Sequence, residues 1–175
     1  RLKVGQSERE DGPKSHLKKS GTPTMGGIIM AISIIGASIV AFGHYMGKEP
    51  EIGKKLIPLI LAAIGFGLVG FIDDYKKVIL RNTDGLKPSA KMLGLLIVSV
   101  LYVIYITQIL NVGTDIIIPF FKTTIKLPLL IYIPFTIFVI LATTNAINLT
   151  DGVDGLATSV TLVIVTTITI IAIIL

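Results

Sequence analysis

The chain has 175 residues, of which 52% are hydrophobic and only 15% are charged. Soluble domains carry about 25% charged residues, and a single core of this size could not bury so many apolar side chains, so the composition excludes a soluble globular protein. The absence of cysteine excludes disulfides, iron–sulfur clusters and cysteine nucleophiles. The formal net charge is +5. Its basic residues lie between long apolar runs, which is typical of membrane proteins rather than of nucleic-acid-binding proteins.

Five apolar runs are long enough to span a membrane, since a spanning helix needs about 20 residues. They predict transmembrane helices at residues 25–46, 56–72, 92–110, 127–147 and 156–175. Between the third and fourth runs, two β-prone segments at 115–119 and 123–127 predict a small external β-hairpin. The expected fold class is an all-α polytopic membrane bundle that forms one domain over residues 1–175. Because the last run ends at Leu175 without a polar flank, we expect a truncated part of a longer protein.

The distribution of lysine and arginine predicts the orientation of the chain in the membrane. If the N-terminus is cytoplasmic, the cytoplasmic segments are 1–24, 73–91 and 148–155, and they contain eleven of the 16 lysine and arginine residues. The outer segments contain the other five, which are Lys48, Lys54, Lys55, Lys122 and Lys126. Short cytoplasmic loops are enriched in basic residues, so the pattern favours a cytoplasmic N-terminus.

Two adjacent carboxylates, Asp73 and Asp74, follow the second apolar run. Charged side chains at membrane depth are costly and usually mark a functional site. Two neighbouring carboxylates repel each other and favour a divalent cation or a shared proton, and Mg²⁺ commonly takes one or two carboxylates together with phosphate oxygens. The pair therefore indicates phosphate chemistry near the cytoplasmic face. The alternative is an interfacial acidic pair that is neutralised by Lys76 and Lys77.

A segment rich in Asn, Asp and Gly begins in the last turn of the fourth apolar run, on the same side of the membrane as the aspartate pair. It contains Asn145, Asn148, Asp151 and Asp154, with two Asp-Gly steps that do not readily continue a helix. Its amide and carboxylate groups suit a nucleoside base or sugar hydroxyls. The alternative is a polar turn in which Asp154 caps the fifth helix.

A third polar cluster precedes the first apolar run. Lys18, Lys19, Thr22 and Thr24 lie just before the expected helix, whose free backbone N–H groups favour anions. The alternative is a basic segment that contacts anionic lipid headgroups. This cluster also falls on the cytoplasmic side, so all three polar clusters are expected at one membrane face.

A glycine pattern in the second apolar run, Gly65-x-Gly67-x-x-Gly70, matches the fingerprint of dinucleotide-binding proteins. The match lies inside a membrane span and no strand precedes it, so the βαβ unit that such a site requires is missing. We therefore interpret the glycines as small residues that allow close helix packing.

The three polar clusters together resemble a known family. The residues that carry the resemblance are Ser15-His16 through Gly27, Asp73-Asp74-Tyr75 with Gly85-Leu86 and Lys91, and Asn145 through Ala157. They resemble the polyprenyl-phosphate N-acetylhexosamine-1-phosphate transferases. Within that superfamily, the run Gly-Thr-Pro-Thr-Met-Gly-Gly is similar to the phospho-N-acetylmuramoyl-pentapeptide transferases of bacterial peptidoglycan synthesis. The resemblance spans nearly the whole chain.

The resemblance implies a ten-helix, Mg²⁺-dependent enzyme of the bacterial cytoplasmic membrane, with its active site on the cytoplasmic face. Such an enzyme moves phospho-MurNAc-pentapeptide from UDP-MurNAc-pentapeptide to undecaprenyl phosphate, giving lipid I and UMP. The resemblance implies that Asp73 and Asp74 are catalytic. The substrate-binding residues that it implies are Lys19, Thr22, Thr24, Lys91, Asn145, Asn148, Asp151 and Asp154. It places the main metal ligand beyond Leu175, so we expect these residues alone to be inactive.

A homodimer is one alternative for the oligomeric state. Two alternative functions also stay open at this point. The first is another polyprenyl-phosphate sugar-1-phosphate transferase. The second is an ion-coupled transporter with Asp73 and Asp74 as its proton or Na⁺ relay. Transporter sites lie near the bilayer midplane and often accompany inverted repeats. Here the carboxylates lie at a helix end and the sequence contains no repeat, which favours the transferase.

Overall fold

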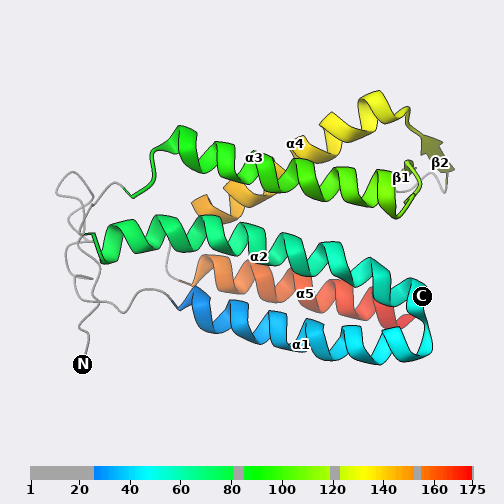
Figure 1. The fold of residues 1–175 in the computed structure, drawn as a ribbon, viewed down its shortest axis with the longest axis horizontal. Helices are drawn as coiled ribbons and strands as arrows, with labels where there is room; N and C mark the ends of the chain where they lie inside the picture. The colour runs from blue at the N-terminus through cyan, green and yellow to red at the C-terminus, as the bar shows by residue number, and fades with distance from the viewer. Residues whose placement is uncertain (1–25, 81–84, 119–122, 152–154, 175) are drawn as a thin grey trace.

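A computed structural model of the chain describes residues 26–80, 85–118, 123–151 and 155–174 (Figure 1). Its long helices are α1 (Gly27–Lys48), α2 (Pro50–Val78), α3 (Pro88–Ile104), α4 (Leu129–Thr150) and α5 (Leu156–Ile174). A π-helix, η2 (Tyr105–Ile109), continues α3, and β1 (Asp115–Ile118) pairs with β2 (Thr123–Lys126). The five helices, with η2 counted as part of α3, are long and apolar enough to cross a membrane. The chain is therefore a multi-pass helical membrane protein, as the sequence predicts.

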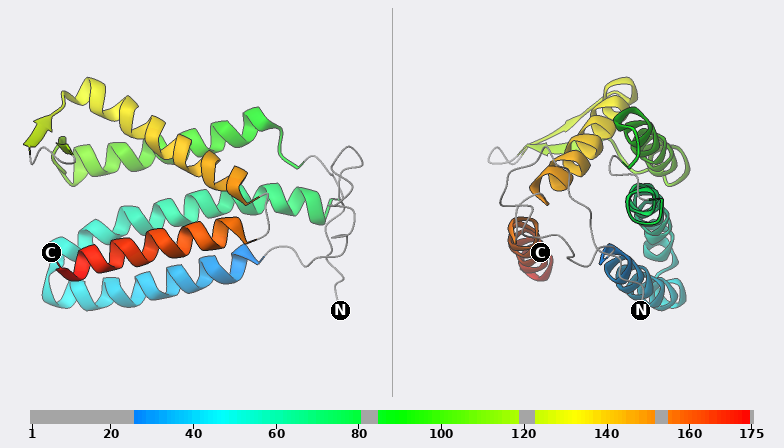
Figure 2. Two further views of the ribbon diagram at one scale, coloured as in Figure 1. Left: turned by 180° about the vertical axis from the view of Figure 1, so that it is seen from behind. Right: turned by 90° about the vertical axis from the view of Figure 1, so that its left-hand side faces the viewer.

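The helices follow one another around an open ring. α1 packs against α2, α2 against α3, and α3 against α4. Seen along the helices in the right-hand view of Figure 2, α5 lies across the ring from α2. Residues from all five helices line a cavity of about 670 Å³, so the ring encloses space that extends to α5.

Four of the buried side chains lie on α3 and its continuation. Leu95, Ser99, Val103 and Thr107 are buried at intervals of four residues, which places them along one face of the helix. The two hydroxyls donate hydrogen bonds to carbonyls of the preceding turn, from Ser99 to Leu95 (2.8 Å) and from Thr107 to Val103 (2.7 Å). Their polar groups are therefore satisfied within the helix, and α3 can lie between α2 and α4.

Glycine allows α2 and α3 to approach closely. A Cβ atom at Gly65 would lie 2.9 Å from Cγ1 of Val98, and one at Gly94 would lie 3.1 Å from Cγ2 of Val69. The interpretation of the glycine pattern as helix packing is therefore confirmed at Gly65. Gly67 and Gly70 have open space beside them among the described residues, so these two glycines do not pack against a described helix.

All five predicted helices are present, but several of their ends differ from the predicted residues. The second span, expected at 56–72, is the helix 50–78, so Pro58 lies inside α2 and not in its first turn. The fourth, expected at 127–147, is 129–150, and the third ends in a π-helix. The predicted bounds followed apolar residues, whereas helical hydrogen bonding continues into the polar flanks. The predicted pairing of the two β-prone segments is confirmed, with Ile116 opposite Ile125.

Candidate functional site

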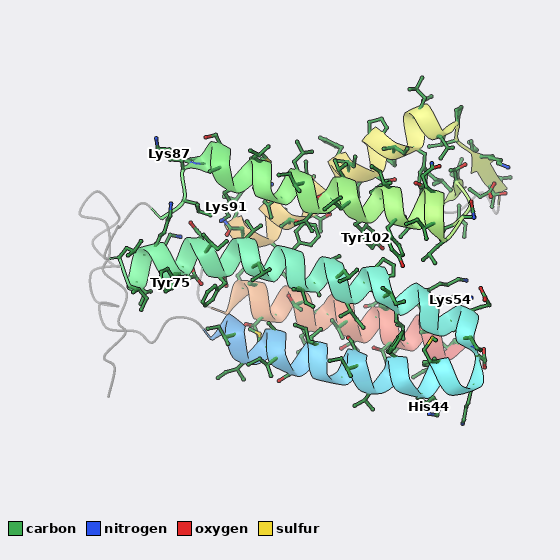
Figure 3. All side chains as sticks on the ribbon, viewed as in Figure 1. His44, Lys54, Tyr75, Lys87, Lys91 and Tyr102 are labelled. Atoms are coloured by element: carbon green, nitrogen blue, oxygen red, sulfur yellow. The ribbon has the colours of Figure 1, made fainter. Side chains whose placement is uncertain are left out.

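One end of the bundle collects the polar residues that the sequence singles out. α2 and α4 end there, and α1, α3 and α5 begin there (Figure 1). Figure 3 shows Tyr75, Lys87 and Lys91 at this end, whereas His44 and Lys54 lie at the other. The alternating helix directions thus bring the end of α2, the start of α3 and the end of α4 to one level of the molecule.

Asp73 is buried at this end, with 6% of its surface exposed. Its Oδ1 atom accepts the backbone N–H of Leu86 at 2.8 Å, and its Oδ2 atom accepts Nζ of Lys77 at 2.8 Å. Nζ of Lys91 lies 3.5 Å from the same Oδ2. Both carboxylate oxygens therefore have partners within the protein. The alternative left open by the sequence was that nearby lysines neutralise the acidic pair. For Asp73 this alternative holds, and the lysines are Lys77 and Lys91.

The turn before α3 closes over Asp73. Gly85 is buried and has a φ of +66°, a conformation that favours glycine. A Cβ atom at this position would lie 2.5 Å from Oδ1 of Asp73 and 2.6 Å from Cε of Lys77. Glycine is therefore required here for two reasons, the backbone conformation and the close approach of the carboxylate. The residue that follows, Leu86, supplies the N–H group to Asp73.

Lys91 connects α2 with α4. Its Nζ atom lies 3.5 Å from Oδ2 of Asp73 and donates a hydrogen bond to Oδ1 of Asn148 at 3.1 Å. The lysine stands in the first turn of α3, and 24% of its side chain is exposed. In the sequence, the basic residues and the amide residues fall into separate clusters. The structure joins them into one group, Asp73–Lys91–Asn148, whose members come from three helices.

Asp74 has different surroundings from its neighbour. Its side chain is exposed, and it lines a cavity of about 390 Å³ between α1 and α2. Within the part of the chain that the structure describes, no lysine or arginine forms an ion pair with it. Gly70 lines both this cavity and the 670 Å³ cavity beside Lys91. Asp74 thus offers a carboxylate to the space between helices.

The end of α4 supplies the amide groups of the site. Asn145, Asn148 and Asp151 line the 670 Å³ cavity together with Lys91. Residues 148–155 were expected in a loop, but α4 continues to Thr150 and Asp151 is its C-cap. The expectation was wrong because the first Gly lies only at 152, and nothing before it interrupts the helix. Nδ2 of Asn145 donates to the carbonyl of Leu141 at 2.7 Å.

Four of the expected substrate-binding residues, Lys19, Thr22, Thr24 and Asp154, lie outside the described residues. Among those described, no three histidine or acidic side chains gather to hold a metal ion. Lys77 and the Leu86 N–H were not among the expected site residues. The four-residue spacing from Asp73 could have indicated Lys77, whereas no sequence signal marks a backbone N–H group.

Comparison with known proteins places this site in a family. Residues 56–175 match the profile of glycosyl transferase family 4. The chain belongs to glycosyl transferase family 4. Its residues 19–29, which include Lys19, Thr22 and Thr24, also match signature 1 of phospho-N-acetylmuramoyl-pentapeptide-transferase. The resemblance seen in the sequence is therefore confirmed.

Proteins similar to this chain include three that bear the name phospho-N-acetylmuramoyl-pentapeptide-transferase. The protein from Acetivibrio thermocellus is 46% identical over 98% of this chain and 49% of its own length. The protein from Thermoanaerobacter sp. is 45% identical (94% and 48%), and that from Clostridium kluyveri is 49% identical (95% and 50%). The chain spans about half the length of the curated relatives it matches.

Proposed function

We propose that the full-length protein transfers phospho-MurNAc-pentapeptide from UDP-MurNAc-pentapeptide to undecaprenyl phosphate, which forms lipid I and releases UMP. The observation that supports this most directly is the group Asp73–Lys91–Asn148 at one end of the bundle. The group combines the positive charge of Lys91 with the amide of Asn148 at a cavity. The chain is also 45–49% identical to relatives that bear the transferase name. A substrate with both phosphate and nucleoside parts needs both kinds of group.

The reaction requires positioning more than covalent help from the protein. An oxygen of the lipid phosphate attacks the β-phosphorus of the UDP-sugar, and the bond from that phosphorus to the oxygen of UMP breaks. Phosphoryl transfer of this type depends on alignment and on neutralisation of negative charge. The ammonium group of Lys91 suits a phosphate oxygen. Oδ1 of Asn148 accepts from Lys91, and its Nδ2 group can donate to the nucleoside.

Asp74 is a described residue that fits a Mg²⁺ ion, as is the exposed Asp151 beside the 670 Å³ cavity. The carboxylate of Asp74 is exposed and has no lysine partner among the described residues, whereas both oxygens of Asp73 already have partners. Mg²⁺ typically binds one or two carboxylates together with substrate phosphates and waters. When bound, the ion would neutralise charge on the diphosphate. Asp74 would hold it, with further ligands from the substrate.

We also propose that the site faces the cytoplasm of a bacterium, in its cytoplasmic membrane. The basic residues of segments 1–24, 73–91 and 148–155 support this orientation, because short cytoplasmic loops are enriched in lysine and arginine. The polar head of a lipid phosphate lies at the membrane boundary, and the site lies at a helix end. A homodimer is part of the proposal, and the mass of the solubilised full-length protein tests it.

Lipid I formation by the purified full-length protein tests the proposed function. The protein is incubated in detergent with undecaprenyl phosphate, UDP-MurNAc-pentapeptide and Mg²⁺, with UDP-GlcNAc as the matched alternative donor. We expect a lipid product and UMP from UDP-MurNAc-pentapeptide, and no product when Mg²⁺ is chelated. Product from UDP-GlcNAc alone would indicate a different sugar-1-phosphate transferase. No product from either donor would contradict the proposal.

A further inference from the structure

We infer that Asp73 is a positioning residue, which closes the Gly85–Leu86 turn and holds Lys91 against Asn148, and that Asp74 alone of the two aspartates faces the reacting groups. The inference rests on the proposed function and divides the roles of the adjacent carboxylates. It follows from where the two side chains lie, since adjacent residues on a helix point about 100° apart.

Both carboxylate oxygens of Asp73 have partners within the protein. Its Oδ1 atom accepts the Leu86 N–H, and its Oδ2 atom accepts from Lys77 and lies 3.5 Å from the ammonium of Lys91. With 6% of its surface exposed, the carboxylate of Asp73 offers little access to a substrate or a metal ion. A buried carboxylate that loses such partners is strongly destabilised. Its present contacts are those of a structural anchor.

The turn over Asp73 approaches its carboxylate closely. Gly85 lies so close that a Cβ atom would meet Oδ1 of Asp73 at 2.5 Å, and its φ of +66° sets the direction of the Leu86 N–H. The turn leads directly to Pro88, where α3 begins, and Lys91 stands in the first turn of that helix. Contact between Asp73 and the turn therefore sets where α3 begins relative to α2.

Lys91 contacts Asn148 as well as Asp73. A lysine side chain has many rotamers, and ordering it costs conformational entropy. Here Asp73 on one side and Asn148 on the other restrict its ammonium group. The negative charge of Asp73 thus helps to place a positive charge at the cavity without itself lining that cavity. Asp74, in contrast, lines the neighbouring cavity and is exposed.

A double-mutant cycle in the full-length protein tests this division of roles. The kinetics of lipid I formation are measured for Asp73→Asn, Lys91→Met and the double variant, with UDP-MurNAc-pentapeptide varied. We expect each single change to raise KM for this donor by about tenfold, the scale of a lost charge-assisted contact. The double variant should be no worse than Lys91→Met, because Asp73 then has no lysine to place at the cavity.

Gly85→Ala is the variant that separates positioning from chemistry, since it keeps every charged group. We expect it to raise KM as Asp73→Asn does, because the added Cβ displaces the turn from Asp73. Lys76→Met is the matched control: it removes a positive charge next to Lys77 in the sequence and should leave KM unchanged. If Asp73→Asn does not give a cooperative melting transition, Gly85→Ala replaces it in the cycle with Lys91→Met.

Two results would overturn the inference while the enzyme is active. One is a fall in kcat of orders of magnitude in Asp73→Asn at unchanged KM, with losses that add to those of Lys91→Met, as expected for a base. The other is Gly85→Ala with parental kinetics. An inactive parent protein would contradict the proposed function instead. In that case the melting temperatures of the four proteins still test the coupling of Asp73 with Lys91.

Discussion

Asn148 is held by its oxygen and not by its nitrogen. Oδ1 accepts a hydrogen bond from Lys91 at 3.1 Å, and within the described residues Nδ2 donates none. The side chain lies beside the 670 Å³ cavity, so a ligand in this cavity would meet an amide donor. Asn145 differs, because its Nδ2 group already donates to the carbonyl of Leu141. Of the two asparagines, Asn148 is therefore the better candidate for nucleoside recognition.

Two substitutions at Asn148 separate nucleoside binding from the placement of Lys91. Asn148→Asp keeps an acceptor for Lys91 but loses the amide donor, whereas Asn148→Ala loses both. We expect both variants of the full-length protein to bind a phosphate-free uridine nucleoside inhibitor more weakly, by about 1–3 kcal/mol, because a polar partner on the ligand is left unsatisfied. Calorimetric titration measures the loss. Parental affinity in Asn148→Asp would show that the residue acts only through Lys91.

The sequence predicts which residues of the site are present but not how they pair. Asp73 was expected in the site because charged groups at membrane depth usually mark function, Asn148 because of the polar segment around it, and Lys91 because of the resemblance. Their contacts join residues up to 57 positions apart, and such contacts depend on helix packing, which the sequence pattern does not specify. The separate surroundings of Asp73 and Asp74 were not predicted, because adjacent aspartates look equivalent in a sequence.

At the scale of the elements, hydropathy predicts that a helix exists better than where it ends. α2 begins at Pro50 and ends at Val78, six residues beyond the expected span at each end. Helical hydrogen bonds do not require apolar side chains, so the helix continues into charged flanks. The extension has a functional consequence: Asp73 and Lys77 become one helical turn apart, and their ion pair of 2.8 Å forms within α2.

Close packing of α2 and α3 makes Gly65 sensitive to substitution. A Cβ atom there would lie 2.9 Å from Val98, whereas one at Gly67, on the same helix, would meet nothing within 4 Å. We expect Gly65→Ala to lower the melting temperature of the solubilised protein. Gly67→Ala should leave it unchanged or raise it, because alanine is the better helix former by about 1 kcal/mol.

The same pair of variants provides its own check. Val98→Ala should restore part of the stability of Gly65→Ala, since it removes the methyl groups that the new Cβ would meet. Equal melting temperatures for Gly65→Ala and Gly67→Ala would contradict the close packing of α2 against α3.

At the scale of the whole molecule, alternating helix directions gather the site at one end and the β-hairpin at the other (Figure 1). The basic residues predict that the site end is cytoplasmic. The chain contains no cysteine, so introduced cysteines can be labelled without background from this region. We expect cysteines at Ser20, Arg81 and Thr150 to react with a membrane-impermeant reagent only from the cytoplasmic side. A cysteine at Thr123 should react only from outside.

Labelling of both Arg81 and Thr150 from outside would contradict the predicted orientation. Labelling of these two positions from opposite sides would contradict the arrangement itself, because the ends of α2 and α4 could then not share one site. The result at Thr123 serves as the internal control, since β2 lies at the opposite end of the bundle.

The central claim is that this end of the bundle carries out phosphoryl transfer. The most direct test compares the rate of UMP exchange between the parent protein and its Asp74→Asn variant. Labelled UMP is exchanged into UDP-MurNAc-pentapeptide by the full-length protein with undecaprenyl phosphate and Mg²⁺. We predict that Asp74→Asn lowers the exchange rate by roughly two orders of magnitude or more, the scale of a lost electrostatic contact in a transition state, at an unchanged melting temperature. Asp115→Asn, at the exposed hairpin, should exchange at the parental rate. Near-parental exchange by Asp74→Asn would contradict the claim.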